Sequence, residues 1–138
     1  MKFISKNENE TRKIAKQFAS TLKNGTIVLL KGDLGAGKTA FVKGVVECFG
    51  GNSSEVTSPT FTIVNEYKLN EKIIFHFDLY RIESVDELYN IGIEEYFYSN
   101  AICFVEWPER APELFDDSVI VVEILKKGIE EREISIGE

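Results

Sequence analysis

The sequence predicts a single α/β domain in which a central parallel sheet, extended by antiparallel additions, is flanked by helices. Three patterns favour this fold class. Apolar runs without alternation, at residues 26–30 and 101–105, are typical of parallel strands covered on both faces. Apolar residues at helical spacing occupy residues 9–23 and 38–49. Alternating apolar and polar residues at 61–80 predict a β-hairpin.

Length and charge are consistent with one acidic domain covering residues 1–138. The chain has 138 residues, with 16 Lys and Arg against 23 Asp and Glu and a formal net charge of −7. Such a chain is poorly suited to gripping phosphate backbones, so direct nucleic-acid binding is disfavoured. The longest apolar runs fall far short of the roughly 20 residues that span a bilayer, and the first nine residues do not resemble a secretory signal. We therefore expect a cytoplasmic protein without membrane association.

The first half of the chain is predicted to form a helix, a strand, a glycine-rich turn and a second helix. The first helix covers residues 9–23 and is ended by Gly25. The strand at residues 26–30 leads directly into the turn. The second helix, residues 38–49, is ended by two consecutive glycines. A strand, a turn and a helix therefore follow one another directly.

The middle of the chain is predicted to form a hairpin of residues 61–69 and 72–80. In its second strand the side chains divide between two faces. One face is apolar, and the other contains His76, Asp78 and Tyr80. We expect the polar face of this strand to take part in the chemistry.

The last part of the chain is predicted to alternate helical turns and strands. Ser84 and Glu87 match a capping box that opens a short helix, and a second helical turn follows at residues 94–98. After the strand at residues 101–105 and a loop with two prolines, residues 118–125 and 130–136 are expected to close the fold as a hairpin. The two cysteines are isolated within apolar runs and are expected to be buried free thiols, Cys48 and Cys103.

A phosphate-binding motif of the form G-x-x-x-x-G-K-S/T lies between the first predicted strand and the second helix. Its eight residues are Gly32, Asp33, Leu34, Gly35, Ala36, Gly37, Lys38 and Thr39. Glycines let backbone N–H groups turn toward an anion, and the helix N-terminus adds its dipole. Lys38 is expected to reach the terminal phosphates and Thr39 to hold magnesium. The motif in this setting predicts a P-loop nucleotide site.

A P-loop site also needs carboxylates for its metal and for the attacking water. Asp78 and Glu106 each follow an apolar strand, at the position where such carboxylates usually lie. For each of them an ordinary acidic residue at a strand end is the alternative interpretation. We expect Lys38, Asp78 and Glu106 to be the catalytic residues.

The sequence also favours ATP over GTP and hydrolysis over phosphate transfer. It lacks the Asn-Lys-x-Asp and Asp-x-x-Gly elements of GTP switches, so ATP and Mg²⁺ are the expected cofactors. Its four arginines are dispersed and form no lid of the kind that a small-molecule kinase uses. A phosphotransferase and a nucleotide-gated binding module without hydrolysis remain the alternatives. Without an evident arginine finger, other than Arg81, intrinsic hydrolysis is expected to be slow.

Three further sites near these motifs have both a functional and a structural interpretation. Ser58, Pro59 and Thr60 lie where a loop would sense the terminal phosphate, or they form an ordinary turn. His76, the single histidine, could shuttle a proton, although lone strand histidines are more often structural. Trp107 directly follows Glu106, although a single tryptophan near a site is most often a packing residue. In either case its fluorescence is a useful probe of nucleotide binding.

Together these motifs resemble the TsaE family, formerly called YjeE. The matching segments are Gly-Asp-Leu-Gly-Ala-Gly-Lys-Thr at 32–39, Ser-Pro-Thr-Phe at 58–61, His-Phe-Asp-Leu-Tyr-Arg at 76–81 and Glu-Trp-Pro-Glu at 106–109. The resemblance runs from Glu10 and Thr11 to about Arg110, and more loosely through the last hairpin. It implies a P-loop NTPase fold and an ATPase that supports the bacterial machinery installing threonylcarbamoyl on adenosine 37 of tRNA.

The resemblance also implies roles for individual residues and partners. Residues 32–39 would cradle the phosphates, Thr39 and Glu106 would contact magnesium, and Asp78 would support the metal or its waters. The switch-like loop of the family corresponds to Ser58, Pro59 and Thr60. Thr11 would lie near the adenine, unless it only caps the first helix, and Arg132 is a weaker candidate. The implied small-molecule partners are ATP and ADP, and the implied protein partners are TsaD and TsaB. These two proteins would bind the tRNA, and this chain would contact it only indirectly.

Overall fold

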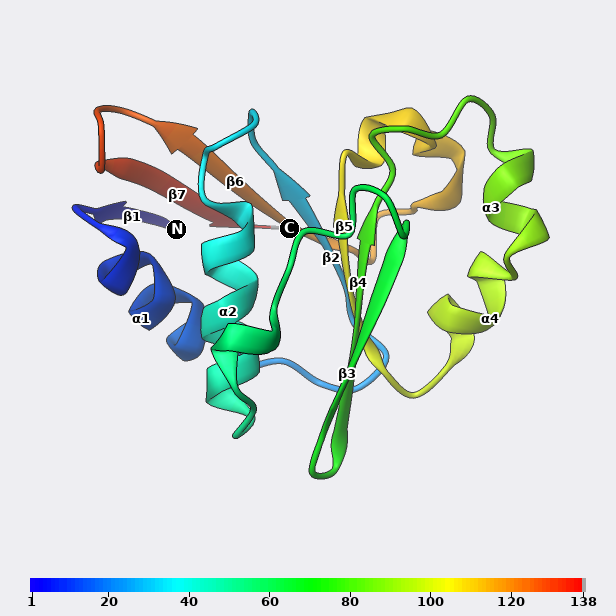
Figure 1. Ribbon diagram of the computed structural model, residues 1–138, viewed down its shortest axis with the longest axis horizontal. Helices are drawn as coiled ribbons and strands as arrows, with labels where there is room; N and C mark the ends of the chain where they lie inside the picture. The colour runs from blue at the N-terminus through cyan, green and yellow to red at the C-terminus, as the bar shows by residue number, and fades with distance from the viewer. Residues whose placement is uncertain (138) are drawn as a thin grey trace.

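A single seven-stranded sheet organises the chain, in the strand order β1-β7-β6-β2-β5-β4-β3. This computed structural model describes residues 1–137 (Figure 1). The strands are β1 Lys2–Ser5, β2 Ile27–Lys31, β3 Val64–Leu69, β4 Lys72–Asp78, β5 Ile102–Glu106, β6 Ile120–Lys126 and β7 Arg132–Gly137. Strands β6, β2, β5 and β4 are parallel neighbours, and β3, β7 and β1 are added antiparallel. The predicted fold class is therefore confirmed.

Helices cover both faces of the sheet. They are α1 Glu8–Ala19, α2 Lys38–Cys48, α3 Asp86–Asn90 and α4 Ile93–Tyr98, with short 3-10 turns at η1 Ser53–Glu55, η2 Pro108–Arg110 and η3 Pro112–Leu114. In Figure 1, α1 and α2 lie to the left of β3, β4 and β5, and α3 and α4 lie to their right. No helix within residues 1–137 is long and apolar enough to cross a bilayer.

Two apolar cores result from this arrangement, one on each face. Between the sheet and the α1–α2 pair, Phe41 of α2 packs with strand residues such as Leu30 and Phe104. On the opposite face, side chains of α3 and α4 pack with a second set of strand residues that includes Phe77 and Val105. Alternate residues of the parallel strands β2, β4, β5 and β6 thus enter different cores, as expected for strands buried on both faces.

The two helices on the first face approach each other very closely. A Cβ atom at Gly44 of α2 would lie 2.4 Å from the carbonyl oxygen of Arg12 on α1, so a side chain there would force the helices apart. The Arg12 guanidinium also forms an ion pair with Glu47 of α2. At the start of α1, the side chain of Asn7 accepts a hydrogen bond from the Glu10 N–H at 2.9 Å and caps the helix.

The parallel centre brings three strand ends to one edge of the sheet. β2, β4 and β5 all end there, at the top of Figure 1. In the strand register Glu106 is the partner of Leu30 on one side and of Asp78 on the other. The turn that follows β2 is therefore next to Glu106, and Asp78 lies one strand further along the same edge.

Some boundaries differ from the sequence-based prediction. Strand β1 was not predicted, and it is held by antiparallel pairing with β7. Helix α1 ends at Ala19 and gives way to turns before residue 23. Strand β3 begins at Val64 because the preceding residue, Ile63, has a φ of 69°, which is incompatible with an extended strand. Only half of the expected capping box forms, with the Glu87 carboxylate accepting from the Ser84 N–H at 3.0 Å.

Two smaller expectations also need correction. Strand β4 ends at Asp78, so Tyr80 is not part of its polar face but lies in the loop beyond it. Of the two free cysteines, Cys103 is buried as expected, whereas Cys48 is only partly buried at the end of α2.

Candidate functional site

The P-loop has the backbone conformation that its glycines permit. It connects β2 to α2 and contains three glycines with positive φ, namely 157° at Gly32, 79° at Gly35 and 109° at Gly37. L side chains rarely adopt such values. A Cβ atom at Gly32 would in addition lie 2.7 Å from the carbonyl oxygen of Ile124 on β6. Glycine is therefore required at Gly32 both by its conformation and by the space around it.

Lys38, the first residue of α2, is held inside the site rather than in solvent. Its side chain is 6% exposed. Nζ donates to the carbonyl oxygen of Gly32 at 2.6 Å and lies 3.8 Å from Oε1 of Glu106. The ammonium also lies 4.3 Å from the centroid of the Trp107 ring. A charge in this position is partly desolvated, so it would interact strongly with an incoming anion.

The two candidate carboxylates lie side by side and almost out of solvent. Asp78 is 3% exposed and Glu106 4% exposed. The Asp78 carboxylate accepts from the Thr60 hydroxyl at 3.0 Å and from the Tyr80 N–H at 2.9 Å. The Glu106 carboxylate shares a hydrogen bond with the ring of His76, whose Nε2 lies 2.5 Å from Oε2. Each carboxylate is thus fixed by a different neighbour.

The loop predicted to sense the terminal phosphate contacts Asp78. Ser58 and Thr60 share a hydrogen bond between their hydroxyls at 2.7 Å, and Thr60 in turn donates to Asp78. The carbonyl of Pro59, which is buried, accepts from the Ile63 N–H at 2.8 Å. The next side chain, Phe61, is 81% exposed. A contact between this loop and the end of β4 is therefore already present.

One cleft joins most of the predicted site residues. It is lined by Lys38, Thr39, Ser58, Thr60, Asp78 and Glu106, together with Glu8, Leu34, Gly35, Gly37 and Ala40. These residues come from α1, the P-loop, α2, the 58–60 loop, β4 and β5. Glu8 was not identified from the sequence, because no motif surrounds it. Asp33 lies instead in a neighbouring hollow on the Trp107 side of the loop.

A second hollow adjoins this cleft and contains Thr11 and Arg132. Gly35, Gly37, Ala40 and Glu8 line both hollows. Thr11 is buried, and its hydroxyl shares a hydrogen bond of 2.7 Å with that of Ser5. Because Asn7 caps α1, the alternative view of Thr11 as the helix cap is wrong. Arg132 donates to the carbonyl oxygens of Ala36 at 2.8 Å and Gly35 at 3.2 Å. This residue was the weaker candidate from the sequence, and it contacts the P-loop directly.

Trp107 occupies an unusual position for a packing residue. Its φ is 55°, in the left-handed region that non-glycine residues rarely adopt. Its ring lies against Lys38 on one side and Tyr80 on another, with 4.9 Å between the Tyr80 and Trp107 ring centroids. Among the residues that the structure describes, nothing accepts a hydrogen bond from its buried Nε1. Trp107 is therefore in direct contact with the charged group of the site.

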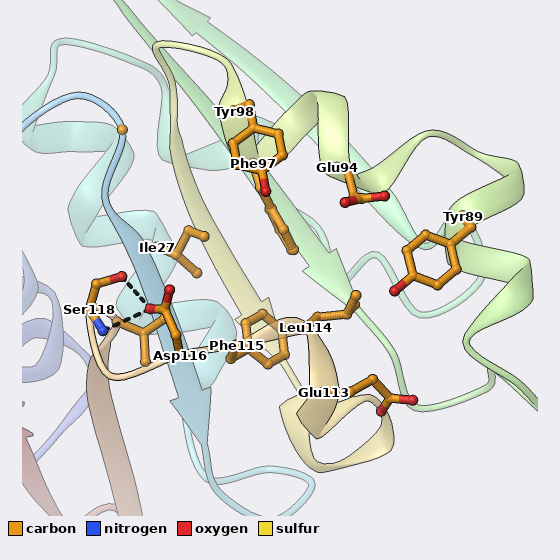
Figure 2. A pocket seen from close by; sticks show the side chains of 12 residues that line it. Ile27, Tyr89, Glu94, Phe97, Tyr98, Glu113, Leu114, Phe115, Asp116 and Ser118 are labelled. Atoms are coloured by element: carbon orange, nitrogen blue, oxygen red, sulfur yellow. Dashed lines mark hydrogen bonds between the residues drawn. The ribbon is translucent and has the colours of Figure 1, made fainter.

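A separate hollow lies at the other end of the sheet, away from the P-loop. Figure 2 shows its aromatic and acidic lining, with Phe97, Tyr98 and Glu94 from α4 facing Leu114 and Phe115. Asp116 accepts two hydrogen bonds from Ser118 there, and these bonds hold the pKa of its carboxyl below the usual value. None of the sequence-predicted site residues lines this hollow.

Comparison with known proteins gives a consistent result. A family model described as "Threonylcarbamoyl adenosine biosynthesis protein TsaE" matches residues 5–134. A Rickettsia felis protein named "tRNA threonylcarbamoyladenosine biosynthesis protein TsaE" is 43% identical over 121 residues, covering 88% of this chain and 70% of its own length. A Bacillus subtilis protein of the same name is 41% identical over 135 residues, covering 98% and 84%. The crystal structure of Bacillus subtilis YdiB superposes with a TM-score of 0.78 at 36% identity, covering 99% of this chain and 83% of that one.

Proposed function

Because the chain belongs to the TsaE family, we propose that it supports threonylcarbamoyladenosine biosynthesis on tRNA by binding and slowly hydrolysing Mg-ATP. The observation that supports this proposal is the meeting of Lys38, Thr39, Asp78 and Glu106 in one cleft at the carboxyl edge of the parallel strands. In open α/β sheets, ligands bind at this edge. Backbone amides at the start of α2 and the adjacent Lys38 ammonium are suited to a triphosphate.

The donor atoms in the cleft suit magnesium. The hydroxyl of Thr39 and the carboxylates of Asp78 and Glu106 are oxygen ligands, which this hard cation prefers. Within residues 1–137 there is no cluster of three or more His, Cys, Asp or Glu residues that could hold a metal by itself. Magnesium usually takes only one or two carboxylates and completes its shell with water and phosphate oxygens, so this small donor set is appropriate. When bound, it would neutralise charge on the phosphates.

Lys38 and Glu106 have separate tasks in this proposal. Lys38 exchanges its hydrogen bond to the Gly32 carbonyl for one to the terminal phosphates. Glu106 contacts the metal or orients the attacking water. Among the described residues, no arginine lines the cleft, and the exposed Arg81 lies over the Phe61 ring, 4.3 Å from its centroid. Slow hydrolysis until a partner completes the site is therefore the expected behaviour.

The proposed partners are the proteins TsaD and TsaB rather than tRNA itself. With a net charge of −7, the chain would gain little from the release of counterions that drives binding to nucleic acid. We propose that the tRNA is contacted by the partner proteins and that this chain supplies nucleotide-dependent turnover in the cytoplasm.

Calorimetric titration of the whole chain with Mg-ATP, Mg-ADP and Mg-GTP tests the nucleotide site. We expect the adenine nucleotides to bind and Lys38→Ala to weaken their binding by about 100-fold, because a charge-assisted contact to phosphate is lost. Lys43→Ala, which removes a partly buried lysine from the same helix outside the cleft, should bind as the unmodified chain does. Absence of binding to the unmodified chain, or equal effects of the two substitutions, would contradict the proposal.

A second experiment separates an ATPase from the two alternative functions. ATP consumption is measured with TsaD and TsaB and with small-molecule phosphate acceptors, and tRNA modification is measured in the same reconstitution. Stimulation by the two proteins supports the proposed role, and stimulation by an acceptor would indicate a phosphotransferase. If Lys38→Ala and Glu106→Ala support modification as well as the unmodified chain does, hydrolysis is not part of the function.

A further inference from the structure

The only histidine of the chain is buried against the proposed metal-binding carboxylate. His76 lies in β4 and is 0% exposed. In the strand register it pairs with Phe104, two residues before Glu106, so the side chains of His76 and Glu106 lie on the same face of the sheet. The ring extends along that face and places Nε2 2.5 Å from Oε2 of Glu106.

The two ring nitrogens of His76 have very different surroundings. Nδ1 is buried and has no hydrogen-bond partner among residues 1–137, whereas Nε2 contacts a carboxylate. An ionised carboxylate can only accept hydrogen bonds, so the ring must donate from Nε2. The contact therefore requires a proton on Nε2, and it is the single polar interaction of the buried ring among the described residues.

The orientation of the Glu106 carboxylate depends on its contact with His76 more than on any other contact. Among the described residues, its carboxylate has no second hydrogen-bond donor, and Oε1 stays 3.8 Å from the Lys38 ammonium. Without the ring, the carboxylate would be free to close on Lys38. That movement would remove a ligand from the metal and would compete with the phosphates for the lysine.

We propose that His76 is a positioning residue that holds Oε2 of Glu106 and thereby directs Oε1 toward the metal and phosphate side of the cleft. This inference rests on the proposed function, because it concerns how the Mg-nucleotide complex is held. Hydrogen-bonded partners of metal-binding carboxylates commonly set the orientation of the ligand, and their loss costs about 10- to 100-fold in metal affinity or activity.

Two polar substitutions distinguish positioning from simple filling of the core. The amide nitrogen of Gln can reach the place of His Nε2, whereas that of Asn reaches only about as far as Nδ1. The measurement is the gain in ADP affinity caused by Mg²⁺, obtained by calorimetry with and without the metal. We expect His76→Gln to keep this gain within about threefold and His76→Asn to reduce it by about tenfold or more. Equal values for the two variants would overturn the inference.

Nuclear magnetic resonance of the unmodified chain tests the same inference without relying on a variant that folds poorly. Because the chain contains one histidine, its ring signals need no assignment among several. We expect the ¹⁵N shifts of the tautomer protonated at Nε2, and a further change when Mg²⁺ is added to the ADP complex. Glu106→Gln should abolish that metal-dependent change.

The possible failures are distinguishable. A ring protonated at Nδ1 alone, or signals that do not respond to Mg²⁺ in an ADP complex that binds the metal, would overturn the inference and leave the proposed function in place. If the unmodified chain binds no Mg-nucleotide at all, the proposed function fails, and the role of His76 fails with it.

Discussion

Arg132 donates from Nε to the carbonyl oxygen of Ala36 at 2.8 Å, across 96 positions of sequence. The same guanidinium donates to Gly35 in the P-loop and, through Nη1, to carbonyls in the turn between β6 and β7, those of Gly128 and Ile129. Hydrogen bonds thereby connect the β6–β7 hairpin to the P-loop. The Gly35 and Ala36 carbonyls are bonded on this side, which favours the observed conformation of the P-loop.

We expect Arg132→Gln to weaken Mg-ADP binding by about tenfold, equivalent to about 1.4 kcal/mol, because ordering the loop would then have to accompany binding. Calorimetric titration measures the change. Lys127→Gln is the matched control, since it removes a positive charge from the same hairpin. The Lys127 ammonium forms an ion pair only with Glu133 among the described residues. An unchanged affinity in Arg132→Gln, or an equal loss in the control, would contradict this role.

Asp78→Asn should loosen the 58–60 loop. The Asp78 carboxylate accepts from the Thr60 hydroxyl and from the Tyr80 N–H, and an amide offers one acceptor oxygen in place of two. We expect amide hydrogen exchange in residues 58–62 to rise about tenfold, which corresponds to losing about 1.4 kcal/mol of local stability. Glu66→Gln, an exposed substitution on the neighbouring strand β3, should leave the exchange unchanged. The prediction is wrong if both variants exchange alike.

The ion pair between α1 and α2 should make stability depend on pH. Its hydrogen bond from Arg12 holds the pKa of the Glu47 carboxyl below the usual value, against a smaller opposing effect of burial. A carboxyl with a lowered pKa stabilises the fold above its unfolded pKa, about 4.3, and this stabilisation is lost as pH falls through the folded value.

Glu47→Gln is therefore expected to lower the free energy of unfolding by about 1 kcal/mol at pH 7. The difference from the unmodified chain should narrow as pH falls below about 4.3. Chemical denaturation at several pH values provides the measurement, with the exposed Glu55→Gln as control. A difference that is constant with pH would show that the ion pair is not its source.

The two cysteines should differ sharply in reactivity. Burial raises the pKa of the Cys103 thiol to about 12, so almost no thiolate is present at pH 8. Cys48 is only partly buried. With an aromatic disulfide reagent at pH 8, we expect Cys48 to react in the folded chain and Cys103 only after unfolding. Cys48→Ser should remove the early reaction, and rapid labelling that persists in this variant would contradict the prediction.

Much of the fold could be predicted because the relevant patterns are local. The strand expected at residues 26–30 is β2 at Ile27–Lys31, and the one expected at residues 101–105 is β5 at Ile102–Glu106. The helix expected at residues 38–49 is α2, which begins at Lys38. Apolar spacing within a few residues sets these elements, so no knowledge of distant contacts was needed. The resemblance to the TsaE family is confirmed as well.

Contacts between segments far apart in the chain could not be predicted from the sequence. β1 has no distinctive apolar pattern, and it becomes a strand by pairing with β7 at the other end of the chain. The same applies to the bond from Arg132 to the P-loop and to that from His76 to Glu106, which depend on which strands become neighbours. Strand ends suggested both Asp78 and Glu106, but only the register shows that the two are direct partners. Their roles toward ATP and magnesium stay predictions.

The pairing of β1 with β7 has a consequence for synthesis of the protein. Ser5 lies opposite Arg132 in this ladder, so β1 cannot form its pairing until β7 has emerged from the ribosome. Arg132, which donates to the Ala36 carbonyl of the P-loop, also belongs to β7. A nascent chain that exposes residues 32–39 but not yet Arg132 therefore lacks these hydrogen bonds to its glycine-rich loop, and the loop gains them only after β7 has been synthesised.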